Sequence, residues 1–495
     1  MSQNLPALLV VVPMMLAPLA ALLNRSGPAW VVAAIGCWFS FGAALQLLSR
    51  VMTEGVIIYS LGGWAAPIGI EYRIDLVSAF VAVIVSSIAA IAILYARTSV
   101  QDEIEEDRHA LFYAAFLLNV CGLLGISITG DVFNVFVFLE VSSLSAYSMI
   151  ALGQDRRALT SAFQYLIMGS VGATFIVIGI GLLFVMTGTL GMMDLAERIP
   201  EVWASGDGDR TIAVAFTFLT VGVMLKLALF PLHLWLPNAY TFAPSAVTGY
   251  MAATSTKVSV YLLMRFFFTV FGEQFSFEQM QLDMVLMPLA LVAIFAMSLV
   301  AIYQMNVKRL LAFSSVAQIG YMVLGISFGS VLGVAAGIIH LFNHAVMKGA
   351  LFMAMGCVIY RIGSVRLEDM KGLGRAMPWT MAAFVGGGLS MIGVPLTVGF
   401  ISKWYLVQAA LEQGRWFVAA VVMVGSLMAL IYIWKVVEVA YFQRREDEAE
   451  IREAPISLLI PTWALVAASF WFGIDAGTTS SVAISAAETL LGVMP

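Results

Sequence analysis

The stretch 221-VGVMLKLALFPLHLWLPNAY-240 is almost wholly apolar, yet it contains Lys226, Pro231 and His233. The chain around it has 495 residues, of which 61% are hydrophobic and 11% are charged, and its mean hydropathy is +0.96. A soluble domain carries roughly 25% charged residues. A helix spans a bilayer with ~20 apolar residues, and this chain contains about fourteen such runs. The sequence therefore predicts an all-α polytopic membrane protein.

The expected spans are continuous apolar runs, so strands of a membrane barrel, which alternate and cross in ~10 residues, are excluded. The spans are expected near 5–24, 28–49, 75–96, 109–129, 131–152, 160–188, 211–237, 245–269, 284–304, 309–329, 332–360, 379–408, 416–441 and 455–473. The first run lacks a basic leader and a small-residue cleavage site, so we expect a retained span. No connection is long enough to fold alone, and 1–495 is expected to form one transmembrane domain.

Lys and Arg in the connections are unevenly distributed between the two sides of the predicted membrane. The connections near 97–108, 153–159, 305–309, 361–378 and 442–454 fall on one side and hold most of them. By the positive-inside rule this basic side faces the cytoplasm, and both termini face outward. The membrane is expected to be the inner (cytoplasmic) membrane of a bacterial cell. The acidic segment 102-DEIEEDRH-109 is then expected to be a solvated cytoplasmic connector.

Some of the 25 Lys and Arg residues lie inside the expected spans. A cation at the bilayer centre costs from ~3 to more than 10 kcal/mol, so such residues usually face protein or water. Arg265 and Lys435 are near span ends and are expected to snorkel. The remaining four are too deep to do so and are candidates for a role in transport: Lys226, Lys257, Lys348 and Lys403.

Glu140 lies halfway along 131-DVFNVFVFLEVSSLSAYSMIAL-152 and is the natural partner for a buried lysine. The two can remain an ion pair whose charge is easily switched, because each group alone in an apolar site tends to become neutral. The structural alternative is a salt bridge with no transport role.

The eleventh expected span contains 339-IHLFNHAVMKGALF-352, in which His340, His344 and Lys348 are spaced by four. That spacing places them on one helical face. Histidine titrates near neutral pH and can both donate and accept a proton, which suits a relay. A metal site at the two histidines lacks a nearby Cys or carboxylate, so we expect no metal and no cofactor.

Two of the expected spans combine helix breakers with a deep lysine. Pro231 and Pro237 follow Lys226, and Pro395, with Gly393 and Gly399, precedes Lys403. Proline frees backbone carbonyls, and within a membrane only protein or water can satisfy them. Broken helices at corresponding positions of two halves favour inverted repeats around a midplane ion path. We expect five-helix repeats at about 109–269 and 284–441, while His233, just past the first break, is either a relay member or a satisfied polar residue.

Several segments resemble the membrane subunits shared by respiratory complex I and the Mrp-type multisubunit cation/proton antiporters. These are FLEVSSLSAY around Glu140, KLALFPLHLWLPNAY around Lys226, APSAVTGYMAATSTKVSVYLLMR around Lys257, and then KRLLAFSSVAQIGYM, HLFNHAVMKGALF and GVPLTVGFISKW. The resemblance covers about residues 75–440. It implies fourteen helices with two inverted repeats, a Glu140–Lys226 pair, a central relay of Lys257, His340, His344 and Lys348, and an exit at Lys403.

Within this family, the chain length, the stretch 60-SLGGWAAPIGIEYRIDLVSAF-80 and Lys403 favour a proton-translocating subunit of an Mrp-type antiporter. Its expected partners are H⁺, Na⁺, other subunits of a membrane complex and the lipid bilayer, but not nucleic acid. A proton-pumping subunit of complex I or of a membrane-bound hydrogenase is the alternative. A quinone-binding or scaffolding subunit and a single-chain symporter are further alternatives from other functional classes.

Overall fold

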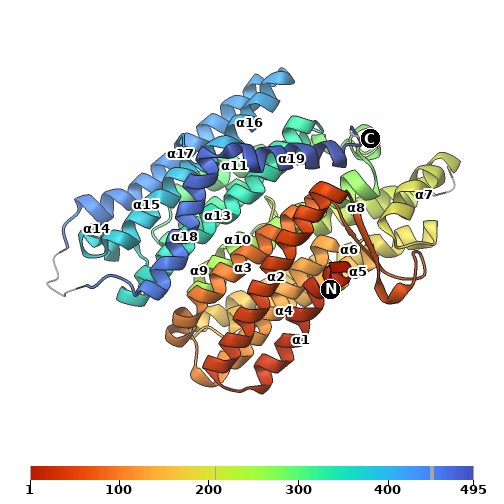
Figure 1. Ribbon diagram of the computed structural model, residues 1–495. Helices are drawn as coiled ribbons and strands as arrows, with labels where there is room; N and C mark the ends of the chain where they lie inside the picture. Colours follow the sequence, from red (N-terminus) through yellow and green to blue (C-terminus); the bar gives the residue numbers. More distant parts are fainter. Residues whose placement is uncertain (1, 207, 446–450, 494–495) are drawn as a thin grey trace.

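The computed structural model describes residues 2–206, 208–445 and 451–493 as a helical bundle (Figure 1). Its first half contains α1 (Leu5–Leu22), α2 (Ser26–Glu54), α3 (Leu76–Glu103), α4 (His109–Ile128), α5 (Val132–Ala151), α6 (Arg156–Thr187), α7 (Met192–Ser205), α8 (Asp209–Leu227), α9 (Trp235–Phe242) and α10 (Ser245–Met264). The second half contains α11 (Asp283–Ile302), α12 (Val307–Ser327), α13 (Val331–Ile362), α14 (Leu373–Ala376), α15 (Pro378–Ile392), α16 (Val398–Glu412), α17 (Trp416–Phe442), α18 (Ile456–Ile474) and α19 (Ala476–Leu490).

The described helices confirm the predicted fold class. Twelve of them are long and apolar enough to cross a membrane. The less apolar α10 and the broken pair α15–α16 account for the other two expected spans. The seventh expected span is also broken, into α8 and α9, as its prolines predict.

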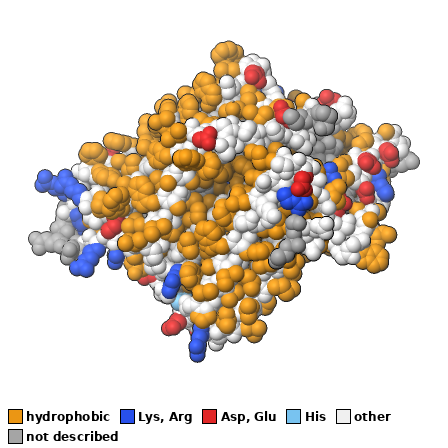
Figure 2. All heavy atoms as spheres, viewed as in Figure 1, with side chains coloured by type: hydrophobic (Ala, Val, Ile, Leu, Met, Phe, Trp, Pro, Cys, Tyr) orange, Lys and Arg blue, Asp and Glu red, His pale blue; other side chains and the backbone are white. Residues whose placement is uncertain are grey.

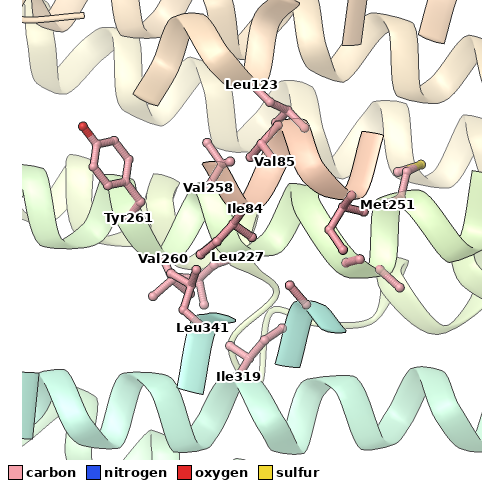
Figure 3. Close-up of a cluster of buried hydrophobic side chains, with 14 of the residues drawn as sticks. Ile84, Val85, Leu123, Leu227, Met251, Val258, Val260, Tyr261, Ile319 and Leu341 are labelled. Carbon is pink, nitrogen blue, oxygen red and sulfur yellow. The ribbon is translucent and has the colours of Figure 1, made fainter. Parts of the chain in front are cut away.

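The middle of the bundle is formed by α10 and α13, which pack against each other. In Figure 1 the N-terminal helices, red to orange, lie on one side of this pair and the blue helices α15–α17 lie on the other. Figure 3 shows buried apolar side chains around α10, contributed by α3, α4, α8, α12 and α13. The ionisable groups in the middle of these two helices, Lys257 on α10 and His340, His344 and Lys348 on α13, are therefore fully buried in the bundle.

The packing order is the same in the two expected repeats. In the first, α4 packs on α5, α5 on α6 and α6 on α8; in the second, α11 packs on α12, α12 on α13 and α13 on α15. Both broken helices hold the same place in this order. The shared order supports the expected repeats at about 109–269 and 284–441, whose boundaries stay a prediction.

Three elements lie where the sequence led us to expect only connections or chain ends. Strands β1 (Ile57–Ser60) and β2 (Glu71–Ile74) form an antiparallel hairpin between α2 and α3. Helix α7 lies in the connection between α6 and α8 and is amphipathic, and α19 follows the last expected span. Hydropathy could not identify these elements, because they are short and their polar faces lower the average.

The surface agrees with a membrane location. Figure 2 shows hydrophobic side chains over most of the visible face, while Lys and Arg gather at its left end and lower edge. Many large apolar side chains are exposed around the bundle, including Trp38 (47%), Phe163 (61%) and Leu427 (60%). A soluble protein avoids contiguous apolar surface on this scale.

Arg265 does not snorkel, so that expectation was wrong. Its side chain is 7% exposed and its Nη2 donates to Asp75 Oδ1, across the α3–α10 contact. The Arg265 Nε donates to Tyr261 Oη at 2.8 Å, and Nη2 donates to Ser78 Oγ at 2.8 Å. Burial raises the pKa of Asp75, which caps the start of α3, but Arg265 and Ser78 outweigh it and hold that pKa below its usual value. The pair is therefore ionised near neutral pH.

Lys435 is half-buried, and its Nζ donates to the Ile302 and Gln304 carbonyls at 3.0 and 3.2 Å. These carbonyls lie at the C-terminal end of α11, where a helix favours a positive charge. Lys435 therefore caps a helix, which gives it a structural role.

Candidate functional site

The break between α8 and α9 is stabilised by side chains close to it. Ala228, directly after α8, has a left-handed φ of 58°, which ends the helix. The indole Nε1 of Trp235 donates to the Leu225 carbonyl at 3.0 Å, so one carbonyl freed by the break is satisfied. Lys226 is consequently held in the last turn of α8, where the end of the helix favours a cation.

Glu140 on α5 and Lys226 on α8 form the expected pair. Lys226 Nζ lies 3.3 Å from Glu140 Oε1 and donates to Ser143 Oγ at 3.0 Å. The Lys226 side chain is 5% exposed, whereas that of Glu140 is 27% exposed on the outer surface of this chain. The carboxylate thus lies at the boundary between the bundle and its surroundings, and the ammonium lies inside.

Close packing of α6 and α8 fixes the position of Lys226. Gly222 lies one turn before Lys226, and a Cβ there would be 2.7 Å from Ile176 Cγ1 and 2.8 Å from the Gly172 carbonyl oxygen. We expect Gly222→Ala to push the two helices apart and to destabilise the protein by about 1–3 kcal/mol. It should also lower transport, because Lys226 then moves relative to Glu140.

Gly181→Ala on α6 is the matched control, since a Cβ there meets nothing within 4 Å. Thermal unfolding of the purified complex measures the effect of both substitutions. Equal melting temperatures for the two variants would show that the close approach does not hold Lys226 in place.

A small cavity of about 30 Å³ lies beside Lys226. Its polar lining comes from Asn119, Ser142, Ser143, Ser255 and Ser259. This volume accommodates one water molecule. The Ser255 hydroxyl has no hydrogen-bond partner among the described residues. The cavity therefore joins Lys226 to α10, the helix that carries Lys257, with hydroxyl groups that can pass a proton.

Lys257 lies on α10 and is fully buried. Its Nζ donates to the Ala252 carbonyl and to Thr256 Oγ1, the latter at 3.3 Å, so among the described residues its hydrogen-bond partners all belong to its own helix. Lys257 is close enough to interact electrostatically with both histidines and Lys348 on α13. Lys257 therefore lies between the ionisable groups of the first half of the chain and those on α13 in the second half.

His340 and His344 are both fully buried on α13, with near-parallel rings whose centroids are 6.2 Å apart. His340 Nδ1 lies 2.8 Å from Ser402 Oγ on α16. His340 Nε2 and both ring nitrogens of His344 have no partner among the described residues. Buried polar atoms are normally paired, and the relay role of these two histidines stays a prediction. Across the described ranges, no group of three His, Cys, Asp or Glu side chains could hold a metal ion.

Lys348 and Lys403 are each bound by backbone and hydroxyl oxygens. Lys348 Nζ donates to the Leu311 carbonyl at 2.8 Å and also to Ser314 Oγ, both on α12. Lys403 Nζ donates to the Met391 and Ile392 carbonyls at 2.9 Å each, at the end of α15. The carbonyls freed by the second break are therefore satisfied by Lys403.

The expected site residues thus occupy one buried band across α5, α8, α10, α13 and α16, with the exception of His233. That residue lies in the first break, where its ring stacks on Phe230 at 5.5 Å and meets the edge of Phe313 at 6.5 Å. Its Nδ1 has no partner among the described residues. His233 contacts aromatic rings, and no described hydrogen bond joins it to the band.

The sequence did not identify the hydroxyl groups that complete the band: Ser143, Thr256, Ser314 and Ser402. Ser and Thr are common in membrane helices, where most bind a carbonyl one turn earlier. Only their distance to a buried ionisable group distinguishes these four, and that distance requires the fold.

Comparisons with known proteins place the chain among membrane subunits of this kind. It is 41% identical over 92% of its length to the N-type subunit of an NADH-quinone oxidoreductase from Desulforudis audaxviator, of which it covers 90%. It is 29% identical over 90% of its length to the D-type subunit of a Na⁺/H⁺ antiporter from Alkalihalophilus pseudofirmus, covering 89% of that chain. It superposes on a chain of the Mrp complex from Dietzia sp. with a TM-score of 0.89 and 25% identity, covering 99% of this chain and 97% of the other. The model of one family matches residues 129–429, and the chain belongs to that family, the NADH:quinone oxidoreductase/Mrp antiporter transmembrane proteins.

Proposed function

We propose that the chain is the D-type subunit of a multisubunit Na⁺/H⁺ antiporter and moves protons along its buried band. The observation that supports this most strongly is the band itself, from the Glu140–Lys226 pair to Lys403. Buried ion pairs and cations contribute little to stability, so a purely structural role gives poor reason for so many. The similarity to the D-type subunit of a Na⁺/H⁺ antiporter and to a chain of the Mrp complex is the reason for proposing Na⁺/H⁺ exchange as the transport reaction.

Glu140 sets the charge of Lys226 in this proposal. While Glu140 is ionised at 3.3 Å, the ammonium is stabilised. A desolvated ammonium that loses its carboxylate tends to release a proton. Protonation or displacement of Glu140 at the exposed boundary therefore drives one proton from Lys226 into the bundle. A movement of the neighbouring subunit is the natural cause, because Glu140 is partly exposed on this chain's surface.

The released proton passes from Lys226 to α10 through the hydroxyl-lined cavity. Each following group accepts one proton and passes one on: first Lys257, then His344 and His340. Lys348 exchanges with the same centre, and Lys403 delivers the proton at the second break. We place the basic side in the cytoplasm and both termini outside, and we assign the Na⁺ path to another subunit, since within the described spans Glu140 is the sole carboxylate of the band.

A complex I-type role is the second candidate, because the relative at 41% identity is a subunit of an NADH-quinone oxidoreductase. Both candidates use the same proton band. They differ in what drives it: a Na⁺ gradient in one case and electron transfer by partner subunits in the other.

The deciding experiment uses the complete complex that copurifies with this chain, reconstituted into vesicles with a pH-sensitive dye inside. We expect an imposed Na⁺ gradient to move protons in the opposite direction, and K⁺ or choline gradients of equal size serve as controls. Proton movement that requires NADH and quinone and does not depend on the Na⁺ gradient would establish the complex I-type role. Transport by the purified chain alone would instead indicate a single-chain transporter.

A further inference from the structure

A polar cavity of about 390 Å³ lies on the basic side of the protein, outside the band described above. Its lining comes from the ends of α3 and α9, the connection between α5 and α6, the start of α12 and the end of α13 with the segment that follows it. Its charged lining consists of Asp102, Glu103, Asp155, Arg157, Lys308 and Arg366. The expectation that 102-DEIEEDRH-109 is merely a solvated connector was wrong at Glu103, which turns into the bundle.

Two of these charged groups form the inner wall of the cavity. Glu103 accepts hydrogen bonds from Ser99 Oγ at 2.7 Å, from the Ser245 backbone N–H at 2.9 Å and from Ser245 Oγ at 3.1 Å. Lys308 is 2% exposed, and its Nζ donates to the Ala243 carbonyl at 2.7 Å. The two side chains are close enough to interact electrostatically. A half-buried acid and a buried base therefore lie beside a cavity large enough for several water molecules.

A line of polar groups leads from Glu103 into the bundle along one face of α3. Ser99 and Tyr95 lie four and eight residues before Glu103, so all three share a helical face. The hydroxyl of Tyr95, which is fully buried, donates to the Met353 carbonyl on α13 at 3.0 Å. This face thus connects the cavity to the helix that carries Lys348.

Lys348 lies on the same helix, five residues before Met353. Its Nζ lies 6.0 Å from the ring centroid of Phe352, the residue directly before Met353. It is bound at Leu311 and Ser314, which lie three and six residues after Lys308 on α12. At 1.5 Å rise per residue, Leu311 is about 4.5 Å from Lys308 along the helix axis. The α12 wall of the cavity therefore lies within one or two helical turns of the groups that bind Lys348.

We propose that this cavity is where the buried band exchanges protons with water on the basic side, with Glu103 as the exchanging group. A hydronium ion in the cavity gives one proton to the Glu103 carboxylate and leaves as water. Glu103 then returns to the carboxylate form as one proton passes along the Tyr95 hydroxyl, which gives one proton and receives one, to the neutral Lys348 amine. Lys308 favours the ionised form of Glu103 and so restores it for the next proton. The inference rests on the proposed function, because it supplies protons to that band.

Glu103→Gln in the reconstituted complex tests the assignment. The Gln side-chain oxygen still accepts from Ser245, so a purely structural role predicts normal transport. A side chain that cannot take up a proton should instead lower Na⁺-driven proton movement roughly tenfold or more, with the Na⁺ concentration for half-maximal rate unchanged. Asp102→Asn, in the same cavity wall but exposed, is the matched control and should transport normally.

Tyr95→Phe gives an independent test that keeps the aromatic packing. It should slow transport to a similar extent, and it decides the matter if Glu103→Gln fails to assemble. Normal transport by Glu103→Gln in an assembled complex overturns the inference, as does normal transport by Tyr95→Phe. Lys226→Ala in parallel separates the two proposals: if it is inactive while Glu103→Gln is normal, only this inference fails. If Lys226→Ala is itself normal, the proposed function fails as well.

Discussion

Lys226→Ala is expected to reduce Na⁺-driven proton movement by about 100-fold or more, because a positioned proton-transfer group contributes at least that much. The substitution removes the buried ammonium that lies 3.3 Å from Glu140, so the pair loses the group that carries the proton. Glu140→Gln should give a comparable loss, since the amide cannot change charge. Proton uptake by vesicles containing the assembled complex measures both.

Lys435→Ala is the control for the loss of a lysine from a span. Its ammonium caps α11, so we expect normal transport and a small loss of stability. Equal transport in all three variants, with normal assembly, would end the proposal that the pair controls proton movement.

Asp75→Leu is expected to destabilise the protein by about 3–5 kcal/mol, because it leaves the buried Arg265 guanidinium without its counter-ion. The pair joins the start of α3 to the end of α10, so the loss should also loosen the helix that carries Lys257. Thermal unfolding of the purified complex in detergent measures the change.

The control is Glu368→Ala, which breaks an ion pair with Arg366 whose side chains are 64% and 68% exposed. Such a surface pair contributes only about 0–1 kcal/mol. The double substitution Asp75→Leu with Arg265→Met should recover much of the loss, because no unpaired charge is then buried. A single Asp75→Leu as stable as the control would contradict a stabilising role for the pair.

The sequence predicted the parts of this molecule that depend on hydrophobicity along the chain. Long apolar runs predict spans, and the prolines beside Lys226 and Lys403 predicted breaks, so the fold class and the broken seventh and twelfth spans could be predicted. Proline alone is not sufficient, because Pro18 and Pro461 lie inside continuous helices. A cationic partner for Glu140 could also be predicted, because a lone acid and a lone base inside lipid each need a partner. The choice of Lys226 among the deep lysines came from the resemblance to the family.

Features that depend on contact between distant segments could not be predicted in this way. Arg265 was near enough to a span end to reach water, and only the fold shows that Asp75, 190 residues away, lies beside it. Glu103 belongs to a strongly acidic segment, yet its carboxylate accepts a hydrogen bond from the Ser245 backbone N–H and points into the bundle. The role of His233 as a relay member stays a prediction, since its described contacts are with the aromatic rings of Phe230 and Phe313.

The hydrogen bonds between Lys403 and the end of α15 connect the charge of this lysine to the rigidity of the second helix break. The same ammonium carries the charge of the band and holds α15 to α16 through the Met391 and Ile392 carbonyls. A charged donor binds such carbonyls about twice as strongly as a neutral one. If Lys403 releases a proton as proposed, these hydrogen bonds come from a neutral amine and hold α15 to α16 less strongly until the proton returns. The proposed proton exit would thereby change the rigidity of the second helix break in every transport cycle.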